Sequence, residues 1–281
     1  YSNDGSSVID SYTVATLPPI IYHNFTISNC GINLPFFTLF LEAKNGCPLP
    51  AVATVNPILI DTPPEGDFEI SPKDTNCVNE LFEFTNTSSL GNYNDVVDGG
   101  CDSVASAQWS IFPISGPIPM YTITSGSLTD YNGFSATFQN DGIFGIRLVL
   151  DSRDDNGTCS PDTIVKSICV MPDPVSSYTL NTHFGCAPMT VTPMNTSNTL
   201  TSCGPTTYLW EVAFIESDCG GDGDYEFINN TTSASINPQI RFNEPGIYHL
   251  TLTVTNECGT DEFLDSIRVA GPPQSEISAI E

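Results

Sequence analysis

The chain of 281 residues carries 33 acidic and seven basic side chains, which gives a formal net charge of −26 at pH 7. A surface this acidic repels phosphate groups and argues against nucleic acid and anionic membranes as partners. Hydrophobic residues make up 40% of the chain, enough to build cores, and no stretch reaches the ~20 apolar residues of a membrane span. Ten cysteines in an acidic chain indicate an oxidising, extracellular environment.

In chain order, residues 1–62 contain only the second half of a repeating unit. The run from Phe37 to Cys47 aligns without a gap on the run from Tyr248 to Cys258. Residues 1–62 are too few for a module of ~100 residues, so we expect the C-terminal half of a module there. At the other end, residues 272–281 resemble the start of a further module. The sequence therefore predicts a segment of a longer array.

Residues 63–171 and 172–271 repeat the same ordered features. Each unit begins with closely spaced prolines and continues through a cysteine, an Asn-Thr-Ser motif, a second cysteine, a tryptophan strand, a glycine-led strand and a cysteine turn. The matching positions are Cys77 and Cys186, 86–88 and 195–197, Cys101 and Cys203, Trp109 and Trp210, 142–148 and 246–252, and Cys159 and Cys258. Such self-similarity indicates tandem modules of one architecture.

The predicted secondary structure is almost entirely β. The apolar residues alternate with a period of two, are often β-branched or aromatic, and are bounded by Gly, Pro, Asn and Asp. Short strands, units of ~100 residues and one tryptophan per unit favour an all-β chain of tandem immunoglobulin-like β-sandwiches. Short proline linkers would join these sandwiches end to end into an extended rod.

The core of each sandwich should form around Trp109 or Trp210. The alternating residues of the glycine-led strands should face these tryptophans, because successive side chains of a strand point to opposite faces. These facing residues are Phe144, Ile146, Leu148, Tyr248, Leu250 and Leu252.

The second full unit resembles the polycystic-kidney-disease (PKD) domain, and the resemblance covers essentially all of residues 174–270. The segments that carry it are 187–191, 195–197, 208–211, 236–238, 245–248 and 250–256. The unit 63–171 resembles the family more loosely, with Phe144 in place of the family's corner tyrosine and Asp141-Gly142 in place of its Pro-Gly. The resemblance implies PKD-like, immunoglobulin-like sandwiches that act as extracellular spacers. Acidic, cysteine-bearing tandem units also resemble the giant surface adhesins of Bacteroidota, including gliding-motility adhesins.

No constellation of residues predicts catalysis. The three histidines, His23, His183 and His249, lie far apart in the sequence, and His249 should point to solvent from an alternating strand. The motifs of serine hydrolases, zinc proteases and phosphate-binding loops are missing. Acidic residues are numerous enough for a glycosidase pair, but surface positions explain them better. We therefore expect a protein without enzymatic activity and without a cofactor.

The sharpest local feature is the acidic, glycine-rich loop 216–226. Asp218, Asp222 and Asp224 supply the hard oxygen ligands that Ca²⁺ prefers, on a backbone that glycine makes adaptable. The alternative interpretation is a solvated acidic turn. We predict a weak calcium site, so that calcium would raise the melting temperature.

The cysteine pairing can be predicted from the poles of an immunoglobulin-type sandwich. Loops B–C and F–G share one pole, whereas the A–B region and the end of strand G share the other. The pairs predicted in this way are Cys101–Cys159, Cys203–Cys258, Cys77–Cys169 and Cys186–Cys219. The alternative Cys159–Cys169 would have to span ~20 Å of strand, too far for a disulfide. Cys30 and Cys47 should not pair with each other, so their partners lie upstream of Tyr1 or they are free.

These observations predict a structural segment of an extracellular adhesin or filament shaft at the cell surface. Its partners would be neighbouring modules of the same chain, and a glycan or protein ligand would be bound elsewhere in the full protein. The alternative function is that of accessory domains in a secreted multidomain hydrolase. A carbohydrate-binding module is a third alternative, but it needs an exposed aromatic platform that core tryptophans do not supply.

Overall fold

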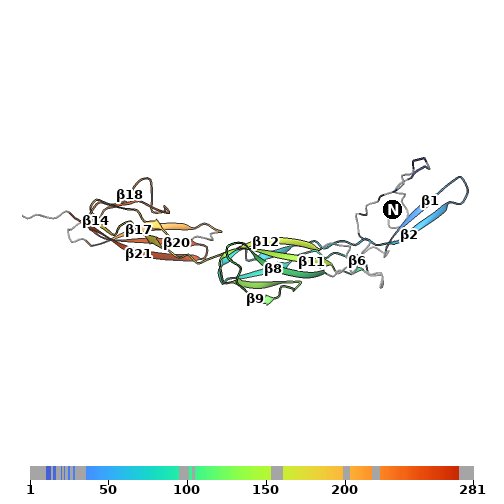
Figure 1. The fold of residues 1–281 in the computed structure, drawn as a ribbon, viewed down its shortest axis with the longest axis horizontal. Coiled ribbons are helices and arrows are strands. Elements are labelled where there is room, and N and C mark those ends of the chain that lie inside the picture. The colour runs from blue at the N-terminus through green and yellow to red at the C-terminus, as the bar shows by residue number, and fades with distance from the viewer. Residues whose placement is uncertain are drawn as a thin grey trace, which may run out of the picture.

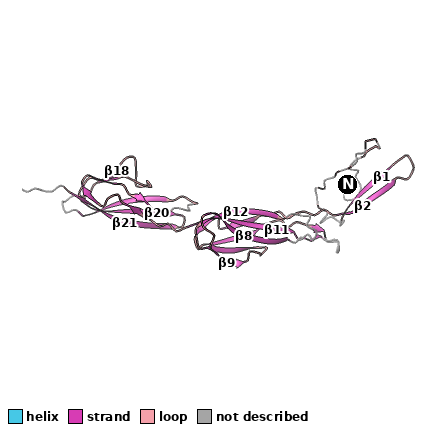
Figure 2. Cartoon of the chain, in the orientation of Figure 1, coloured by secondary structure: helices cyan, strands magenta, loops and turns pink. Residues whose placement is uncertain are grey.

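The computed structural model describes residues 11–13, 15–16, 20, 22, 25, 28, 36–94, 101–102, 105–152, 161–198, 203–216 and 222–271. Within these ranges the regular elements are all strands, and no helix has the length and hydropathy that crossing a membrane requires. A hairpin and two β-sandwiches follow one another along the long axis of the molecule (Figures 1 and 2). The all-β fold class predicted from the sequence is confirmed.

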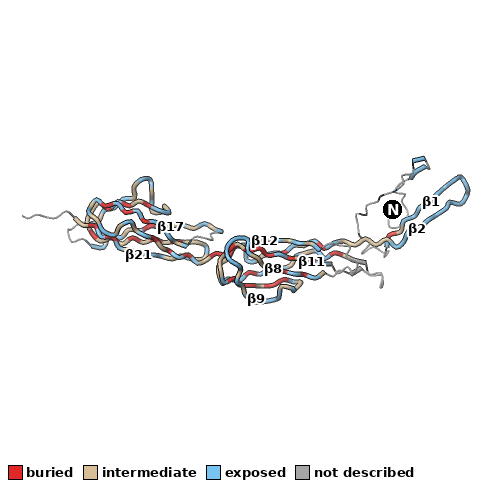
Figure 3. The backbone as a smooth tube through the Cα atoms, viewed as in Figure 1, coloured by how far each residue is buried: buried red, intermediate tan, exposed pale blue. Residues whose placement is uncertain are grey.

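The hairpin consists of β1 (Phe37–Ala43) and β2 (Ala51–Ile58), paired antiparallel. Most of its residues are exposed, so that it is largely pale blue in Figure 3. The exposed apolar side chains include Leu39, Phe40, Leu41, Val52 and Val55. That this hairpin belongs to the second half of a module stays a prediction, as do the boundaries of the other modules.

The first sandwich stacks two four-stranded sheets, with the strand orders β3-β5-β10-β9 and β4-β12-β11-β8. The strands of the first sheet are β3 (Phe68–Ser71), β5 (Leu81–Asn86), β10 (Gly133–Phe138) and β9 (Tyr121–Gly126). Those of the second sheet are β4 (Thr75–Cys77), β12 (Asp162–Met171), β11 (Gly142–Ser152) and β8 (Ala105–Ser115). A two-stranded ladder of β6 (Tyr93–Asn94) and β7 (Cys101–Asp102) accompanies them.

The second sandwich repeats this plan with fewer strands in one sheet. Its larger sheet has the order β14-β21-β20-β17 and its smaller sheet the order β15-β19-β18, with β13 and β16 forming a separate pair. The larger sheet contains β14 (Phe184–Cys186), β21 (Gly259–Ala270), β20 (Gly246–Asn256) and β17 (Thr207–Glu216). The other strands are β15 (Met189–Val191), β19 (Ile240–Phe242), β18 (Tyr225–Phe227), β13 (Tyr178–Thr179) and β16 (Met194–Asn195). Two packed sheets with mainly antiparallel pairing define the immunoglobulin-like sandwich.

In both sandwiches the entering chain changes sheets. In the first, β3 pairs antiparallel with β5, and the chain then crosses to the opposite sheet, where β4 pairs parallel with β12. In the second, β13 pairs with β16 before β14 pairs parallel with β21. The parallel pairing places the short edge strand beside the end of the last strand, at the pole from which the chain leaves the sandwich.

The tryptophan cores are confirmed. Trp109 is 2% exposed and Trp210 is 1% exposed, and buried residues form the interior of both sandwiches in Figure 3. The six residues predicted to face the tryptophans are all fully buried. Each indole Nε1–H donates a 2.9 Å hydrogen bond to a backbone carbonyl, that of Asp130 or of Ser235, so neither buried donor is left without an acceptor.

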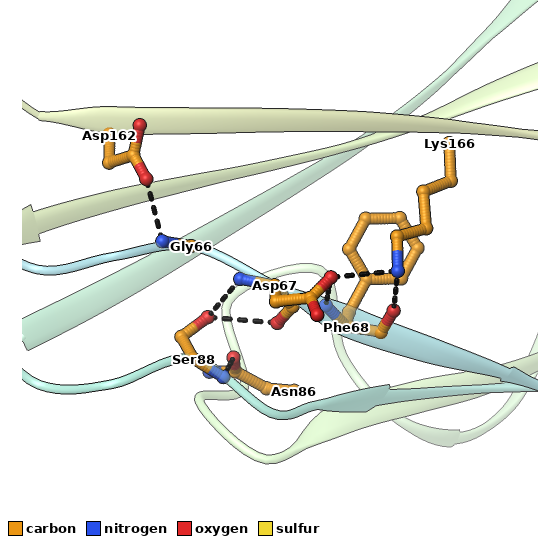
Figure 4. A network of polar contacts seen from close by, with 7 residues as sticks. All are labelled: Gly66, Asp67, Phe68, Asn86, Ser88, Asp162 and Lys166. Carbon is orange, nitrogen blue, oxygen red and sulfur yellow. Dashed lines mark hydrogen bonds and ion pairs between the residues drawn. The ribbon is translucent and has the colours of Figure 1, made fainter.

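The repeated Asn-Thr-Ser motif holds the entering strand (Figure 4). Ser88 Oγ accepts a 2.9 Å hydrogen bond from the Asp67 N–H and donates one of 2.9 Å to the Asp67 carbonyl. Asn86 Oδ1 accepts the Ser88 N–H at 3.0 Å, which shapes the turn. One residue before Asp67, the Gly66 N–H donates to the Asp162 carboxylate at 2.6 Å. The motif therefore satisfies backbone groups at the point where the chain enters the sandwich.

The second sandwich uses the same contacts. Ser197 Oγ accepts the Ser177 N–H at 3.0 Å and donates to the Ser177 carbonyl at 3.1 Å. Asn195 Oδ1 accepts the Ser197 N–H at 2.9 Å. The Ser176 N–H donates to the carboxylate of Asp261 at 2.7 Å, as Gly66 does to Asp162. The recurrence of these bonds explains why the motif is repeated in the sequence.

A lysine completes the entry contacts of the first sandwich only. Lys166 Nζ donates to the Phe68 carbonyl at 2.5 Å, lies 2.7 Å from Asp67 Oδ1, and stands 5.1 Å from the centroid of the Phe68 ring (Figure 4). The hydrogen bond from Lys166 lowers the pKa of Asp67 below its usual value, with help from the Phe68 N–H. In the second sandwich, Asp265 stands at the position of Lys166, because it pairs with Leu250 as Lys166 pairs with Ile146.

Candidate functional site: the junction between the sandwiches

The two sandwiches are joined by the short segment 172–174. Strand β12 ends at Met171, and the chain forms its first pairing in the second sandwich at Val175, which bridges Asn198. Two of the three intervening residues are proline, and Pro174 is buried. Because proline fixes its own φ angle, the segment has few conformations and holds the sandwiches close to each other.

Two disulfides cross this junction. Cys77, at the end of β4, bonds to Cys258 in the turn between β20 and β21, with the Cα atoms 5.6 Å apart. Cys169, on β12, bonds to Cys203, which precedes β17, with the Cα atoms 6.1 Å apart. Both separations lie in the usual range for a disulfide. Together with the peptide linker, the bonds make three covalent connections between the sandwiches.

The predicted pairs Cys77–Cys169 and Cys203–Cys258 are wrong, although the poles assigned to these cysteines are consistent with the structure. Cys77 and Cys169 lie on neighbouring strands, since Met171 pairs with Cys77 and Cys169 with Thr75. Cys203 and Cys258 likewise share the facing pole of the second sandwich. The short linker brings these two poles together, so each cysteine bonds across the junction and not within its own module.

The remaining cysteines give a mixed outcome. Cys186 is free and exposed, so the predicted bond Cys186–Cys219 is not formed, and Cys219 lies outside the described residues. The predicted pair Cys101–Cys159 cannot be compared, because Cys159 and the side chain of Cys101 also lie outside them.

Two further predictions concerned bonds that should not form. The rejected pair Cys159–Cys169 is not present, because Cys169 bonds to Cys203. Cys47 is free and exposed, which is one of the two outcomes expected for it, and Cys30 lies outside the described residues.

Polar contacts accompany the disulfides. Lys73, just before β4, forms an ion pair with Glu257 in the turn of the second sandwich, and both side chains are about half exposed. Asn256 has two roles, since its Oδ1 accepts the Cys258 N–H at 2.7 Å and its Nδ2 donates to the Pro172 carbonyl at 3.1 Å. Asn256 therefore both shapes the turn that presents Cys258 and ties this turn to the linker.

Sequence reasoning did not identify Lys73 or Asn256 as junction residues. A signal for Asn256 is present, however, because Asn-Gly-Cys at 45–47 and Asn-Glu-Cys at 256–258 share the asparagine two residues before the cysteine. In the hairpin, the Cys47 N–H donates to Asn45 Oδ1 at 3.1 Å, so the two turns have the same local hydrogen bond.

The predicted calcium site stays a prediction. Asp218 lies outside the described residues, whereas Asp222 and Asp224 are both exposed. Asp224 Oδ2 accepts a 3.0 Å hydrogen bond from Asn243 Nδ2. Among the described residues, no three His, Cys, Asp or Glu side chains gather closely enough to hold a metal ion.

The described histidines show no common site. His183 Nε2 lies 2.9 Å from Asp265 Oδ2 on the exposed surface of the second sandwich. His249 is half-buried on β20, at a position between the fully buried Tyr248 and Leu250. Its side chain therefore lies on the outer face of the sheet, as the alternation predicts. His23 lies outside the described residues.

Comparison with known proteins gives similarity of fold only. No protein-family model and no curated protein matches the chain. Among solved structures, an I-band fragment from titin aligns with a TM-score of 0.38 and 14% identity, over 75% of this chain and 66% of the fragment. FdeC, an adhesin of Escherichia coli, aligns with a TM-score of 0.44 and 13% identity, over 79% of this chain and 69% of the other. The D00–D0 domain of intimin aligns with a TM-score of 0.42 and 8% identity, over 74% and 99% of the two chains.

Proposed function

We propose that the chain is a structural segment of an extracellular adhesin or filament shaft, which holds a distal binding region away from a cell surface. The observation that carries the proposal is the junction, where the disulfides Cys77–Cys258 and Cys169–Cys203 cross from one sandwich to the next. A pair of modules that only needed to fold would gain as much from disulfides within each module. Bonds between modules restrict the bending and rotation of one module against the other.

The disulfides also support an extracellular location. Disulfides persist in oxidising compartments and are rare in the reducing cytosol. The net charge of −26 suits a surface filament, because neighbouring shafts of like charge repel one another and remain separate.

The finer identity rests on sequence resemblance. The resemblance of residues 174–270 to the PKD domain supports a spacer role, and the resemblance of the acidic, cysteine-bearing repeats to Bacteroidota adhesins supports adhesion or gliding as the setting. In this proposal the segment itself is not catalytic and binds no cofactor, and the glycan or protein ligand is bound by another region of the full protein.

Small-angle scattering of the 281-residue chain, with and without a thiol reductant, tests the proposal. We expect an elongated particle on the order of 100 Å long under oxidising conditions, from strands of ~3.3 Å per residue in successive modules. Reduction should broaden the distribution of lengths, because the two modules then bend about the linker. A compact particle, the same distribution before and after reduction, or turnover of glycan or peptide substrates by this segment would contradict the proposal.

A further inference from the structure

We propose that Cys186 forms the next inter-module disulfide, with the turn cysteine of a sandwich that follows Gly271. The proposal rests on the function proposed above, because it requires the array to continue. It goes beyond that function by naming Cys186 as the residue that forms the next junction. Its partner would be the cysteine of an Asn-x-Cys turn between two antiparallel strands, on a module like the second sandwich.

Cys186 occupies the same place in its sandwich as Cys77 does in the first. On the parallel edge strands, Cys77 pairs with Met171, the last residue of β12, and Cys186 pairs with Ala270, the last residue of β21. The following backbone bonds also match, since the Val78 N–H donates to the Met171 carbonyl as the Ala187 N–H does to that of Ala270, each at 2.9 Å.

The two cysteines differ in whether they have a partner and in exposure, since Cys77 is half-buried and Cys186 is exposed. Cys77 is bonded to Cys258 of the next module. Cys186 is exposed and free at the exit pole of the second sandwich. The first junction therefore shows what the position of Cys186 does when a following module is present.

The sequence beyond Ala270 repeats the spacing of the proline and serine residues that follow Met171. Pro174 lies three residues after Met171, and Pro273 lies three residues after Ala270. A serine follows two residues later in both cases, at Ser176 and Ser275. Because the linker at 172–174 brings the turn of the second sandwich against Cys77, a linker of equal length would bring the turn of a following sandwich against Cys186.

The chain also shows that the partner turn is a repeated element. Asn45 and Cys47 reproduce the hydrogen bond of Asn256 and Cys258, and Cys47 is likewise free and exposed. A thiol in such a turn is therefore exposed to solvent where no partner cysteine is bonded to it. The hairpin thus carries a free turn cysteine, Cys47, and the second sandwich carries a free edge-strand cysteine, Cys186. These are the two kinds of cysteine that bond to each other at the first junction.

The second bridge of the first junction is not repeated at the next one. Cys169 lies opposite Thr75 in the parallel ladder, and the equivalent position opposite Phe184 is occupied by Arg268. The junction at Cys186 would thus contain one disulfide where the first contains two, and the following module needs no cysteine equivalent to Cys203.

The oxidation balances as in any disulfide formed from two thiols. A bond forms between Cys186 Sγ and the Sγ of the turn cysteine, and the two thiols lose two protons and two electrons. These reduce one disulfide of a dithiol–disulfide oxidoreductase to its dithiol. Formation of Cys77–Cys258 from two thiols needs a two-electron oxidant of the same kind, so the proposal requires no additional reagent.

The test is a peptide map of the full-length native protein, with free thiols blocked by an alkylating agent before digestion without reduction. We expect the peptide that contains Cys186 to be linked to a peptide from beyond residue 281, with an asparagine two residues before its cysteine. Detection of Cys77–Cys258 in the same digest is the internal control. Alkylated Cys186, or Cys186 linked to Cys219 or any other cysteine of residues 1–281, would overturn the inference.

A second measurement uses only the sequence in hand. Residues 271–281 of the chain are replaced by another copy of residues 172–271, placed directly after Ala270, so that the copied Pro174 lies three residues after Ala270 as Pro174 does after Met171. We expect Cys186 of the first copy to bond to Cys258 of the second, and the variant Cys186→Ser to lose this bond while Cys77–Cys258 is kept. A free Cys186 in this extended chain also counts against the inference. An elongated particle with Cys186 unbonded would leave the shaft function standing and reject only the bridge.

Discussion

The two sandwiches share their strand order but differ in the polarity of their cores. Phe68 packs edge-on against Trp109 in the first sandwich, with ring centroids 5.2 Å apart, and Tyr178 packs in the same way against Trp210 in the second, at 4.9 Å. A second exchange places Phe144 in the first core and Tyr248 in the second, each fully buried. Two equivalent core positions thus hold an aromatic ring in both sandwiches, and only the second sandwich adds a hydroxyl group at each.

The hydroxyl groups are tolerated because each finds an acceptor. Tyr178 Oη donates to the Leu250 carbonyl at 2.5 Å, and Tyr248 Oη donates to the Glu244 carbonyl at 2.8 Å, four residues upstream. A buried hydroxyl without a partner would cost more than its burial contributes. Both sandwiches therefore share the packing of these aromatic rings in the core. The hydrogen bonds of the tyrosine hydroxyl groups are present only in the second sandwich.

The largest expected effect comes from removing the ring that both cores share. Trp109→Ala should destabilise the first sandwich, and Trp210→Ala the second, by roughly 3–5 kcal/mol each, because a large buried side chain leaves a cavity. Denaturant unfolding followed by circular dichroism measures the change. The exposed residues Ile118 and Ile236 provide controls, since their replacement by alanine should change stability by less than about 0.5 kcal/mol. Equal effects at buried and exposed positions would contradict the assigned core.

The next effect separates the two modules from each other. The double variant Cys77→Ser, Cys258→Ser should lose about 2–4 kcal/mol of stability, because the disulfide no longer restricts the unfolded chain. Differential scanning calorimetry should show the two sandwiches unfolding at more widely separated temperatures. Cys186→Ser is the matched control in the 281-residue chain, since it changes an equivalent cysteine that is free. Identical thermograms for the double variant and the wild type would be incompatible with a junction held by this bond.

A smaller effect should distinguish the two cores. Tyr178→Phe and Tyr248→Phe should each cost about 0.5–1.5 kcal/mol, the usual net value of a hydrogen bond, because the ring stays and only the hydroxyl is lost. Tyr121→Phe in the first sandwich is the control, because the Tyr121 hydroxyl makes no hydrogen bond to any described residue. A loss of several kcal/mol would mean that the tyrosines carry more than one hydrogen bond each.

The tyrosines also predict a dependence on pH. Burial raises the pKa of Tyr178 and, for the same reason, that of Tyr248. Because the folded-state pKa is raised, the protonated tyrosines contribute fully to stability below the unfolded pKa of about 10. This contribution is lost as the pH rises from the unfolded pKa through the higher folded pKa. The second sandwich should therefore weaken at high pH more than the first, and the two Tyr→Phe substitutions should reduce this difference.

The smallest effect concerns the entry contacts that only the first sandwich has. Lys166→Met should raise the pKa of Asp67 towards its ordinary value, because the hydrogen bond from Lys166 is the main cause of the lowered pKa. Because the pKa of Asp67 is lowered in the folded state, its ionised carboxylate stabilises the fold at pH values above the unfolded pKa. This contribution to stability is lost as the pH falls through the folded pKa. Titration of the Asp67 carboxyl carbon by NMR measures the shift. An unchanged pKa would show that Lys166 does not contact this carboxylate in solution.

Much of the fold could be predicted because its signals are local. A period of two in 142–148 and 246–252 specifies which side chains enter the core, and the register of a sheet preserves that assignment. The tryptophans and their facing residues were therefore placed correctly. The role of the Asn-Thr-Ser motif was not predicted, because its bonds reach Asp67 and Ser177, which lie about 20 residues earlier in the chain.

The sequence by itself determined the β-sandwich class, the core tryptophans and the poles at which the four bonded cysteines lie. Only the tertiary structure decided which cysteines bond. A disulfide requires Cα atoms within about 7 Å of each other, and that distance depends on how segment 172–174 sets one module against the next. Two poles that meet across a short linker place Cys77 beside Cys258 and Cys169 beside Cys203, and no periodicity within a single module contains that information.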